Sequence, residues 1–118
     1  MYNIYFYEDS RGIKPVKEFI RELGSHSDKA SRVRLGKLND YIQQISEYGT
    51  RAGHPYVKHL DGEIWEIRPN RDRVLFAAAL NNGFVLLHHF IKKTQKTPKR
   101  EIDQAKRNLV HFKEVHGL

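Results

Sequence analysis

The side chains of this sequence that are best suited to chemistry are cationic, and they gather in its second half. Residues 92–100 hold five lysines and arginines and no acidic residue, and Arg68 and Arg73 lie shortly before them. Arginine binds a phosphate through two parallel hydrogen bonds, whereas lysine acts as a point charge. Lysines crowded by other cations have lowered pKa values and can transfer protons near neutral pH. The pattern favours a site that grips phosphates or cleaves RNA through its 2′-hydroxyl group.

Residue types alone leave three interpretations of this cationic cluster open. It is a catalytic site, an RNA-binding surface without catalysis, or a charged face exposed to solvent. The whole chain has a net charge of +7 and an isoelectric point near 9.7, which favours an anionic partner such as nucleic acid. Its 118 residues predict one domain that spans positions 1–118.

Several other classes of site lack the residues they require. The chain has no cysteine, which excludes disulfides, thiolate zinc sites and cysteine nucleophiles. His88 and His89 are neighbours on a predicted strand and point to opposite sides, so they cannot bind one ion together. We therefore expect no metal ion. No apolar stretch approaches the length of a bilayer and no secretory leader is visible, so we expect a cytoplasmic protein with no membrane partner.

The periodicity of apolar residues predicts the elements that position the cations. A helix begins at Pro15 and ends before Gly24, and a second, capped by Ser27 or Asp28, ends at Gly49. A last helix follows Pro98. Runs rich in β-formers, separated by turn residues such as Asp-Gly and Asn-Gly, predict strands at 2–7, 56–60, 64–68, 73–80 and 84–93.

These elements predict an α+β fold. A small, twisted, mainly antiparallel sheet packs on an N-terminal helical hairpin, and a helix ends the chain. We expect the hairpin to cover one face of the sheet and the other face to stay partly open. The open face is where we expect the site.

Strand alternation assigns the cations to faces of that sheet. If Trp65 and Ile67 face the helices, Glu66 and Arg68 lie on the opposite face, and Arg73 joins them from the next strand. Glu66 is then the acid expected among these cations, and we expect it to pair with Arg68 or Arg73. If Phe90 is in the core, His89 and Lys93 join Arg68 and Arg73. A β-bulge in the last strand would exchange the two sets.

Three segments of the sequence resemble a known family. These are Ile64–Pro69, Arg73–Phe76 and Leu86–Pro98, the last of which ends in Phe-Ile-Lys-Lys-Thr-Gln-Lys-Thr-Pro. They resemble the phage-derived branch of the HigB/RelE toxin family, and the resemblance covers nearly the whole chain. It implies a RelE-like fold and the toxin of a type II toxin–antitoxin system. The activity implied is a ribosome-dependent, metal-independent endoribonuclease that cuts mRNA, needs no cofactor and is held in a hetero-oligomer by a HigA-like helix-turn-helix antitoxin.

The resemblance also implies roles for individual residues. Arg73 and Arg68 contact the scissile phosphate, and Lys93 is a further cationic catalytic residue. RNA binding is assigned to Lys92, which replaces Lys93 in catalysis if the strand parity is shifted, and to Lys96, His89 and Lys99. The chain departs from the family in two ways: its last helix has no counterpart of the tyrosine that some RelE members use, and His89 stands where a small residue is expected. A noncatalytic RNA- or ribosome-binding module and a basic interaction protein therefore stay open as alternatives.

Overall fold

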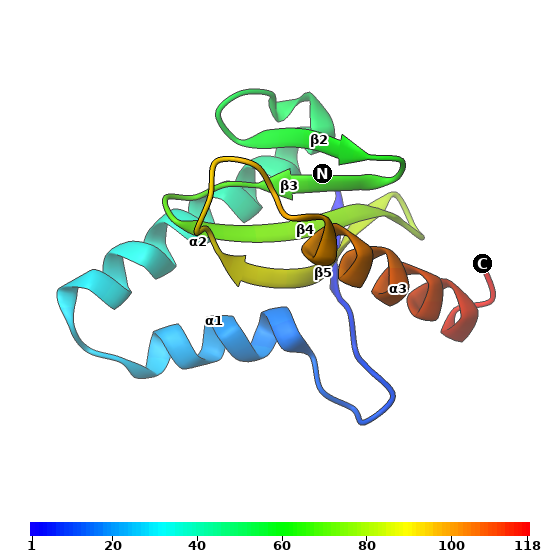
Figure 1. Ribbon diagram of the computed structural model, residues 1–118, viewed down its shortest axis with the longest axis horizontal. Coiled ribbons are helices and arrows are strands. Elements are labelled where there is room, and N and C mark those ends of the chain that lie inside the picture. Colours follow the sequence, from blue (N-terminus) through cyan, green and yellow to red (C-terminus); the bar gives the residue numbers. More distant parts are fainter.

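A five-stranded sheet lies between two helical layers in the computed structural model, which describes residues 1–118 (Figure 1). The α+β class predicted from the sequence is confirmed. The elements, in chain order, are β1 (Asn3–Phe6), α1 (Pro15–Ser25), α2 (Lys29–Tyr48), the 3₁₀ turn η1 (Gly49–Ala52), β2 (Val57–Asp61), β3 (Ile64–Ile67), β4 (Asp72–Ala79), β5 (Gly83–Ile91) and α3 (Lys99–Val115).

The sheet has the order β1-β5-β4-β3-β2, and four of its strands form the predicted antiparallel meander. The N-terminal strand β1 pairs in parallel with β5 at one edge. Gly83 begins β5 close to the backbone of β1, since a Cβ atom there would lie 2.5 Å from the carbonyl oxygen of Asn3. A residue with a side chain does not fit at this point without a shift of the backbone.

Helices α1 and α2 begin and end close to the predicted positions. Pro15 stands in the first turn of α1, which continues to Ser25. Asp28 caps α2, since its side chain accepts a hydrogen bond from the backbone N–H of Ser31 at 2.9 Å. The helix ends at Gly49, whose φ of 61° is in the left-handed region. None of the three helices combines the length and the apolar character needed to cross a lipid bilayer.

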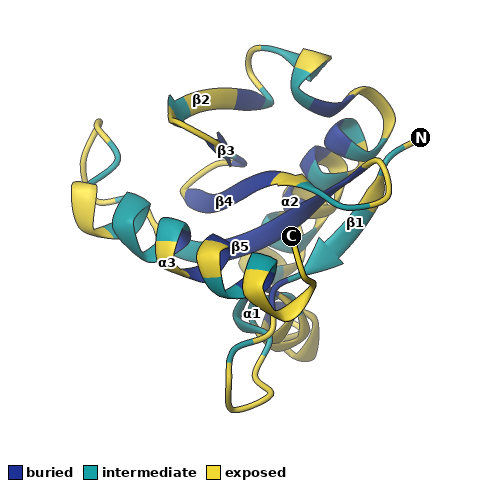
Figure 2. Ribbon diagram, turned by 90° about the vertical axis from the view of Figure 1, so that its right-hand side faces the viewer, coloured by how far each residue is buried: buried dark blue, intermediate teal, exposed yellow.

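The helical hairpin covers one face of the sheet, as expected. Figure 2 shows the buried strands β4 and β5 in dark blue between the helical layers. The residues that form this core are apolar and come from both helices and four strands: Val16, Leu23, Leu38, Tyr41, Ile45, Val57, Ile67, Val74, Phe76, Phe84 and Leu86. The helices are thereby fixed against the centre of the sheet.

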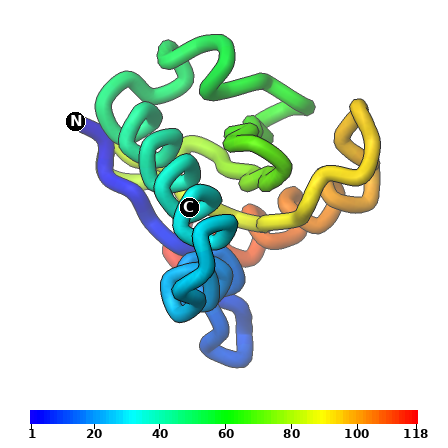
Figure 3. The backbone as a smooth tube through the Cα atoms, turned by 90° about the vertical axis from the view of Figure 1, so that its left-hand side faces the viewer, coloured from blue at the N-terminus to red at the C-terminus, as the bar shows by residue number.

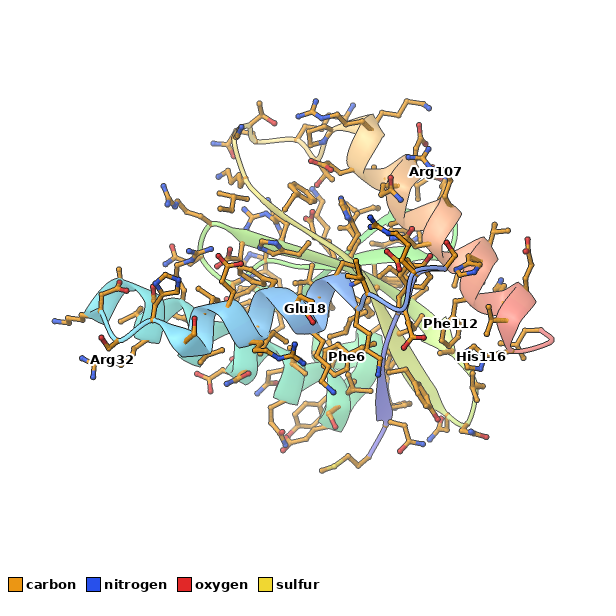
Figure 4. The ribbon with its side chains drawn as sticks, turned by 90° about the horizontal axis from the view of Figure 1, so that it is seen from below. Phe6, Glu18, Arg32, Arg107, Phe112 and His116 are labelled. Carbon is orange, nitrogen blue, oxygen red and sulfur yellow. The ribbon has the colours of Figure 1, made fainter.

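The opposite face is not open, which corrects the expectation from the sequence. α3 packs there through Ala105, Leu109 and Phe112, against a second core that includes Leu75 and Leu87. Seen from below, the sheet runs between α3 on one side and α2 on the other (Figure 4). The apolar side of α3 had to be buried against some surface, and the uncovered face of the sheet was available.

A bulge in β5 changes which side chains face α3. Leu75 pairs with His88 and Phe76 pairs with Leu86, so Leu87 is the extra residue in β5. The carbonyl oxygen of Leu87 accepts a hydrogen bond from Asn108 Nδ2 of α3 at 2.8 Å. Beyond the bulge the alternation of side chains is displaced by one residue, as a bulge requires.

Candidate functional site

Arg68 and Arg73 lie at the end of the sheet where β3 finishes and β4 begins. Ile67 and Val74 are paired, so the next residues outward, Arg68 and Arg73, come opposite one another. Both line one hollow of about 390 Å³, which we call the arginine hollow. Its other lining residues are Tyr41, His54, Pro55, Val57 and Lys58. The structure thus brings together two of the three residues assigned to catalysis.

Arg73 is held rigidly at this position. Its side chain is nearly buried, and its Nη1 donates hydrogen bonds to the carbonyl oxygens of Asn70 at 2.8 Å and Asp72 at 2.9 Å. Burial, followed by the positive charge of Arg68, lowers the pKa of Arg73 below its ordinary value, but an arginine stays charged in proteins. Because both bonds use Nη1, the N–H groups of Nε and Nη2 are left for an anion.

Glu66 lies beside the arginines, as strand alternation predicted. Its side chain is fully buried, and its Oε1 lies 3.3 Å from Nε of Arg68, which confirms the expected pairing with one of the arginines. Its Oε2 accepts a hydrogen bond of 2.7 Å from the hydroxyl of Thr97. The carboxylate therefore contacts both Arg68 and the segment that follows β5.

That segment, residues 92–98, carries most of the predicted RNA-binding lysines, and we call it the lysine loop. It leaves β5 where the backbone N–H of Lys92 donates to the carbonyl oxygen of Arg71 at 2.8 Å. Lys93 and Lys96 are exposed, and Lys92 is half-buried. Figure 3 shows the loop in yellow, where it extends away from the sheet before α3 begins. The lysines are therefore presented to solvent at the end of the sheet that holds the arginines.

Lys93 does not line the arginine hollow. It lines a separate hollow of about 340 Å³, together with His89 of β5 and with Arg100 and Glu101 from the first turn of α3. Lys99 is exposed, and its Nζ lies 2.7 Å from Asp103, one turn further along the helix. Arg68 and Arg73 thus line one hollow, whereas Lys93 and His89 line another.

His89 lies on the face of the helical hairpin and does not share a face with Arg73, so the alternative stated for a β-bulge in the last strand is confirmed. The reason is the bulge at Leu87. Phe90, which pairs with Arg73, packs on the α3 side, whereas the His89 ring stacks on Phe19 of α1 with centroids 3.4 Å apart. Asp72 accepts a hydrogen bond from His89 Nε2 at 3.1 Å.

Asp72 also forms a two-point ion pair with Arg34 of α2. The Arg34 Nη2 and Nε atoms donate to the two carboxylate oxygens at 2.7 and 3.1 Å. Burial raises the pKa of Asp72, but the hydrogen bonds from His89 and Arg34 outweigh burial and lower that pKa to about 2. The carboxylate therefore stays charged in the core and links α2 to the strand that carries Arg73.

Four residues near the site were not singled out by their sequence pattern. Tyr41 and His54, which can exchange protons, line the arginine hollow. Thr97 bonds to Glu66, which is 31 residues away in the sequence, and Asp72 bonds to Arg34, which is 38 residues away. No local spacing signals such contacts, because they depend on how the strands and helices pack. No group of three or more histidine and acidic side chains is placed to hold a metal ion.

The comparison with known families adds one finding to this geometry. Residues 21–110 match the family model described as phage derived protein Gp49-like (DUF891). The matched span includes α2, strands β2 to β5, the arginine hollow and the lysine loop. A search of curated proteins finds no match.

Proposed function

This chain belongs to the phage-derived Gp49-like family, a RelE/HigB-like toxin family, and we propose that it is the toxin of a type II toxin–antitoxin pair. Its activity is the cleavage of mRNA during translation, as a ribosome-dependent and metal-independent endoribonuclease. The observation that carries the proposal is the pair of arginines in one hollow, with Arg73 fixed by two backbone carbonyls.

The proposed reaction is an intramolecular transfer at a phosphodiester. A base removes the proton of a ribose 2′-hydroxyl, and the 2′-oxygen forms a bond to the adjacent phosphorus. The bond from phosphorus to the 5′-oxygen of the next nucleotide breaks, and an acid protonates that oxygen. The products are a 2′,3′-cyclic phosphate and a new 5′-hydroxyl end, and no water or redox partner is consumed.

The residues of the site divide this work by their chemistry. Arg73 and Arg68 neutralise the charge that develops on the phosphate oxygens, and preorganised donors are effective because they need not rearrange during the reaction. Lys93, or Lys92 in its place because the bulge shifts the parity of β5, takes part in proton transfer or stabilises the leaving oxygen. Tyr41 and His54 are further proton-exchanging groups within the arginine hollow. Lys92, Lys96 and Lys99 bind the RNA backbone, and His89 supports the site from the buried side.

The proposed partners follow from the same assignment. The toxin binds the ribosome and its mRNA through the cationic end of the sheet. A HigA-like helix-turn-helix antitoxin forms a hetero-oligomer with it and keeps it inactive. The protein works in the cytoplasm, where translation takes place.

A noncatalytic RNA- or ribosome-binding module is the second candidate. Two observations favour it: Lys93 lies in a hollow separate from the arginines, and α3 contains no tyrosine. A basic protein that only binds an acidic partner is the third. The three candidates differ in whether RNA is cut and whether ribosomes are bound.

Primer extension on a reporter mRNA, translated by purified ribosomes with and without the protein, tests the proposal. We expect cuts in phase with codons, and only when ribosomes are present. The double variant Arg73→Gln, Lys93→Gln should lower the cleavage rate by about 10²-fold or more, because loss of one preorganised donor costs that much in other enzymes.

Ribosome pelleting separates the outcomes. Retained ribosome binding with lost cleavage supports catalysis by these residues. Arg21→Gln is the matched control, because Arg21 is an exposed arginine on α1 that pairs only with Glu18, and it should cut like the wild type. Wild-type protein that binds ribosomes and leaves mRNA intact would establish the second candidate, and protein that binds no ribosome would leave the third.

A further inference from the structure

The buried carboxylate of Glu66 is an unusual feature of the cationic end of the sheet. Glu66 is at 0% exposure in the centre of β3, where it pairs with Lys58 of β2 and Leu75 of β4. A buried carboxylate destabilises a fold unless other groups bond to both of its oxygens. A neutral apolar residue at this position would destabilise the folded protein less than a carboxylate does. The contacts of Glu66 must therefore explain why a carboxylate is present.

Only one of its oxygens has a hydrogen bond of good geometry. Thr97 donates to Oε2 at 2.7 Å. Oε1 lies 3.3 Å from Nε of Arg68, but the two groups are not aligned, and both atoms are buried without another hydrogen-bond partner. The ion pair between Glu66 and Arg68 is therefore close but lacks an aligned hydrogen bond.

Thr97 belongs to the lysine loop, and its bond to Glu66 is the side-chain attachment at the far end of that loop. At the near end, the backbone N–H of Lys92 is bonded to Arg71 in the turn between β3 and β4. The residues between these two points, 93–96, are exposed. A single carboxylate thus contacts the loop through one oxygen and Arg68 through the other.

We propose that Thr97 and Glu66 form a clamp that positions the lysine loop, and with it Lys93, relative to Arg68 and the arginine hollow. Thr97 acts through other residues and is a positioning residue. The inference rests on the proposed function, because it gives the clamp a role in RNA cleavage. It explains how two separate hollows can serve one phosphodiester: the carboxylate between them fixes their relative position.

The variant Thr97→Val tests the clamp, because valine keeps the shape of threonine and lacks the hydroxyl. Trypsin cleaves after lysine, so the rate of cleavage within the lysine loop measures whether the loop is attached to Glu66. We expect cleavage after Lys92, Lys93 and Lys96 to become about tenfold faster, the effect of losing one hydrogen bond to a charged group. Thr97→Ser keeps the hydroxyl and should restore resistance to within about twofold of the wild type.

Cleavage after Lys58, within β2, is the internal control. Global unfolding would accelerate cleavage at Lys58 as much as in the loop, whereas release of the loop leaves Lys58 protected. If trypsin cleaves the loop at the same rate in the valine variant and the wild type, the proposal of a clamp is overturned. A serine variant whose loop is cut as fast as that of the valine variant would also overturn it.

Single-turnover cleavage of ribosome-bound mRNA tests the role of the clamp in the site. Thr97→Val should lower the rate at saturating ribosome concentration by about tenfold, while the half-saturating concentration stays within about twofold. A loosened loop with an unchanged rate would overturn the positioning role. If the wild type itself cuts no RNA, the proposed function and this role both fail, while the trypsin experiment still decides whether Thr97 attaches the loop.

Discussion

Asp72 and Arg73 are neighbours in sequence, and their side chains serve different faces of the sheet. Asp72 bonds to Arg34 and His89 on the side of the helical hairpin. Its own carbonyl oxygen accepts a hydrogen bond from Arg73 Nη1. The buried ion pair thus fixes the backbone that in turn fixes the arginine, and one residue connects the stability of the fold to the geometry of the site.

Asp72→Asn should destabilise the protein at neutral pH by about 2 kcal/mol, the free energy that corresponds to the lowered pKa of Asp72. The folded pKa is about 2 and the ordinary value is 3.8. The carboxylate therefore contributes its full stability above about pH 4. This contribution is lost as the pH falls towards 2, where Asp72 becomes protonated in the folded protein as well.

Urea unfolding of the wild type and of Asp72→Asn between pH 2 and pH 7 measures this effect. The difference in unfolding free energy between them should be largest near pH 7 and shrink steadily below pH 4. Asp103→Asn, which removes a surface partner of Lys99, should leave the unfolding free energy at pH 7 close to that of the wild type. A difference between wild type and Asp72→Asn that stays constant over the whole range would contradict the assignment.

At the scale of elements, the bulge in β5 decides what each face of the sheet presents. The extra residue Leu87 leaves a carbonyl oxygen outside the regular ladder, and Asn108 of α3 donates to it at 2.8 Å. α3 therefore does more than cover apolar surface, because it also satisfies the backbone where the strand is irregular. This contact fixes the position of α3 along the sheet and so the point at which the lysine loop must end.

Asn108→Leu should lower the unfolding free energy by about 1–3 kcal/mol, because it leaves the buried carbonyl oxygen of Leu87 without a donor. Thermal or urea unfolding measures the loss, and amide hydrogen exchange should be faster in β5 around Leu87. Arg107→Leu is the matched control: Arg107 is the preceding residue of α3, and its exposed side chain points away from the body of the molecule (Figure 4). A control variant as unstable as Asn108→Leu would show that the hydrogen bond is not the cause.

At the scale of the whole molecule, the net charge of +7 is concentrated towards the C-terminal half of the chain. The fold brings part of that charge to one end of the sheet, where the arginine hollow and the lysine loop lie. A local excess of cations attracts a polyanion over a distance set by the salt concentration. We therefore expect the association with RNA to depend strongly on ionic strength.

Binding of the protein to single-stranded RNA should weaken as potassium chloride is added. If the cationic end contacts about four phosphates, a plot of log K against log salt concentration has a slope of roughly −3. Lys96→Gln should make the slope shallower by about 0.7, because one phosphate contact is lost. Lys113→Gln should leave the slope unchanged, since Lys113 is already paired with Glu63 at 2.8 Å on another part of the surface. A slope near zero in the wild type would exclude phosphate binding as the source of affinity.

Most of the fold could be predicted from the sequence, because its signals are local. The apolar spacing from Val16 to Leu23, the cap at Asp28 and the stop at Gly49 each act within a few residues along the chain. The pairing of Glu66 with Arg68 also follows from strand alternation, since residues two positions apart along an extended chain share a face. The fold class and the gathering of Arg68 and Arg73 were therefore determined by the sequence alone.

The tertiary structure decided the features that depend on packing between distant segments. The bulge at Leu87 decided between the two faces that the sequence left open for His89, because the position of the extra residue depends on how β5 and α3 fit together. α3 closed the face that was expected to be open, because its apolar side needed a partner. The partner of Thr97 lies 31 residues away in sequence, and local patterns carry no information about such a contact. The periodicity of apolar residues shows which side chains are buried. The partners of buried polar groups are determined only by how the helices pack on the sheet.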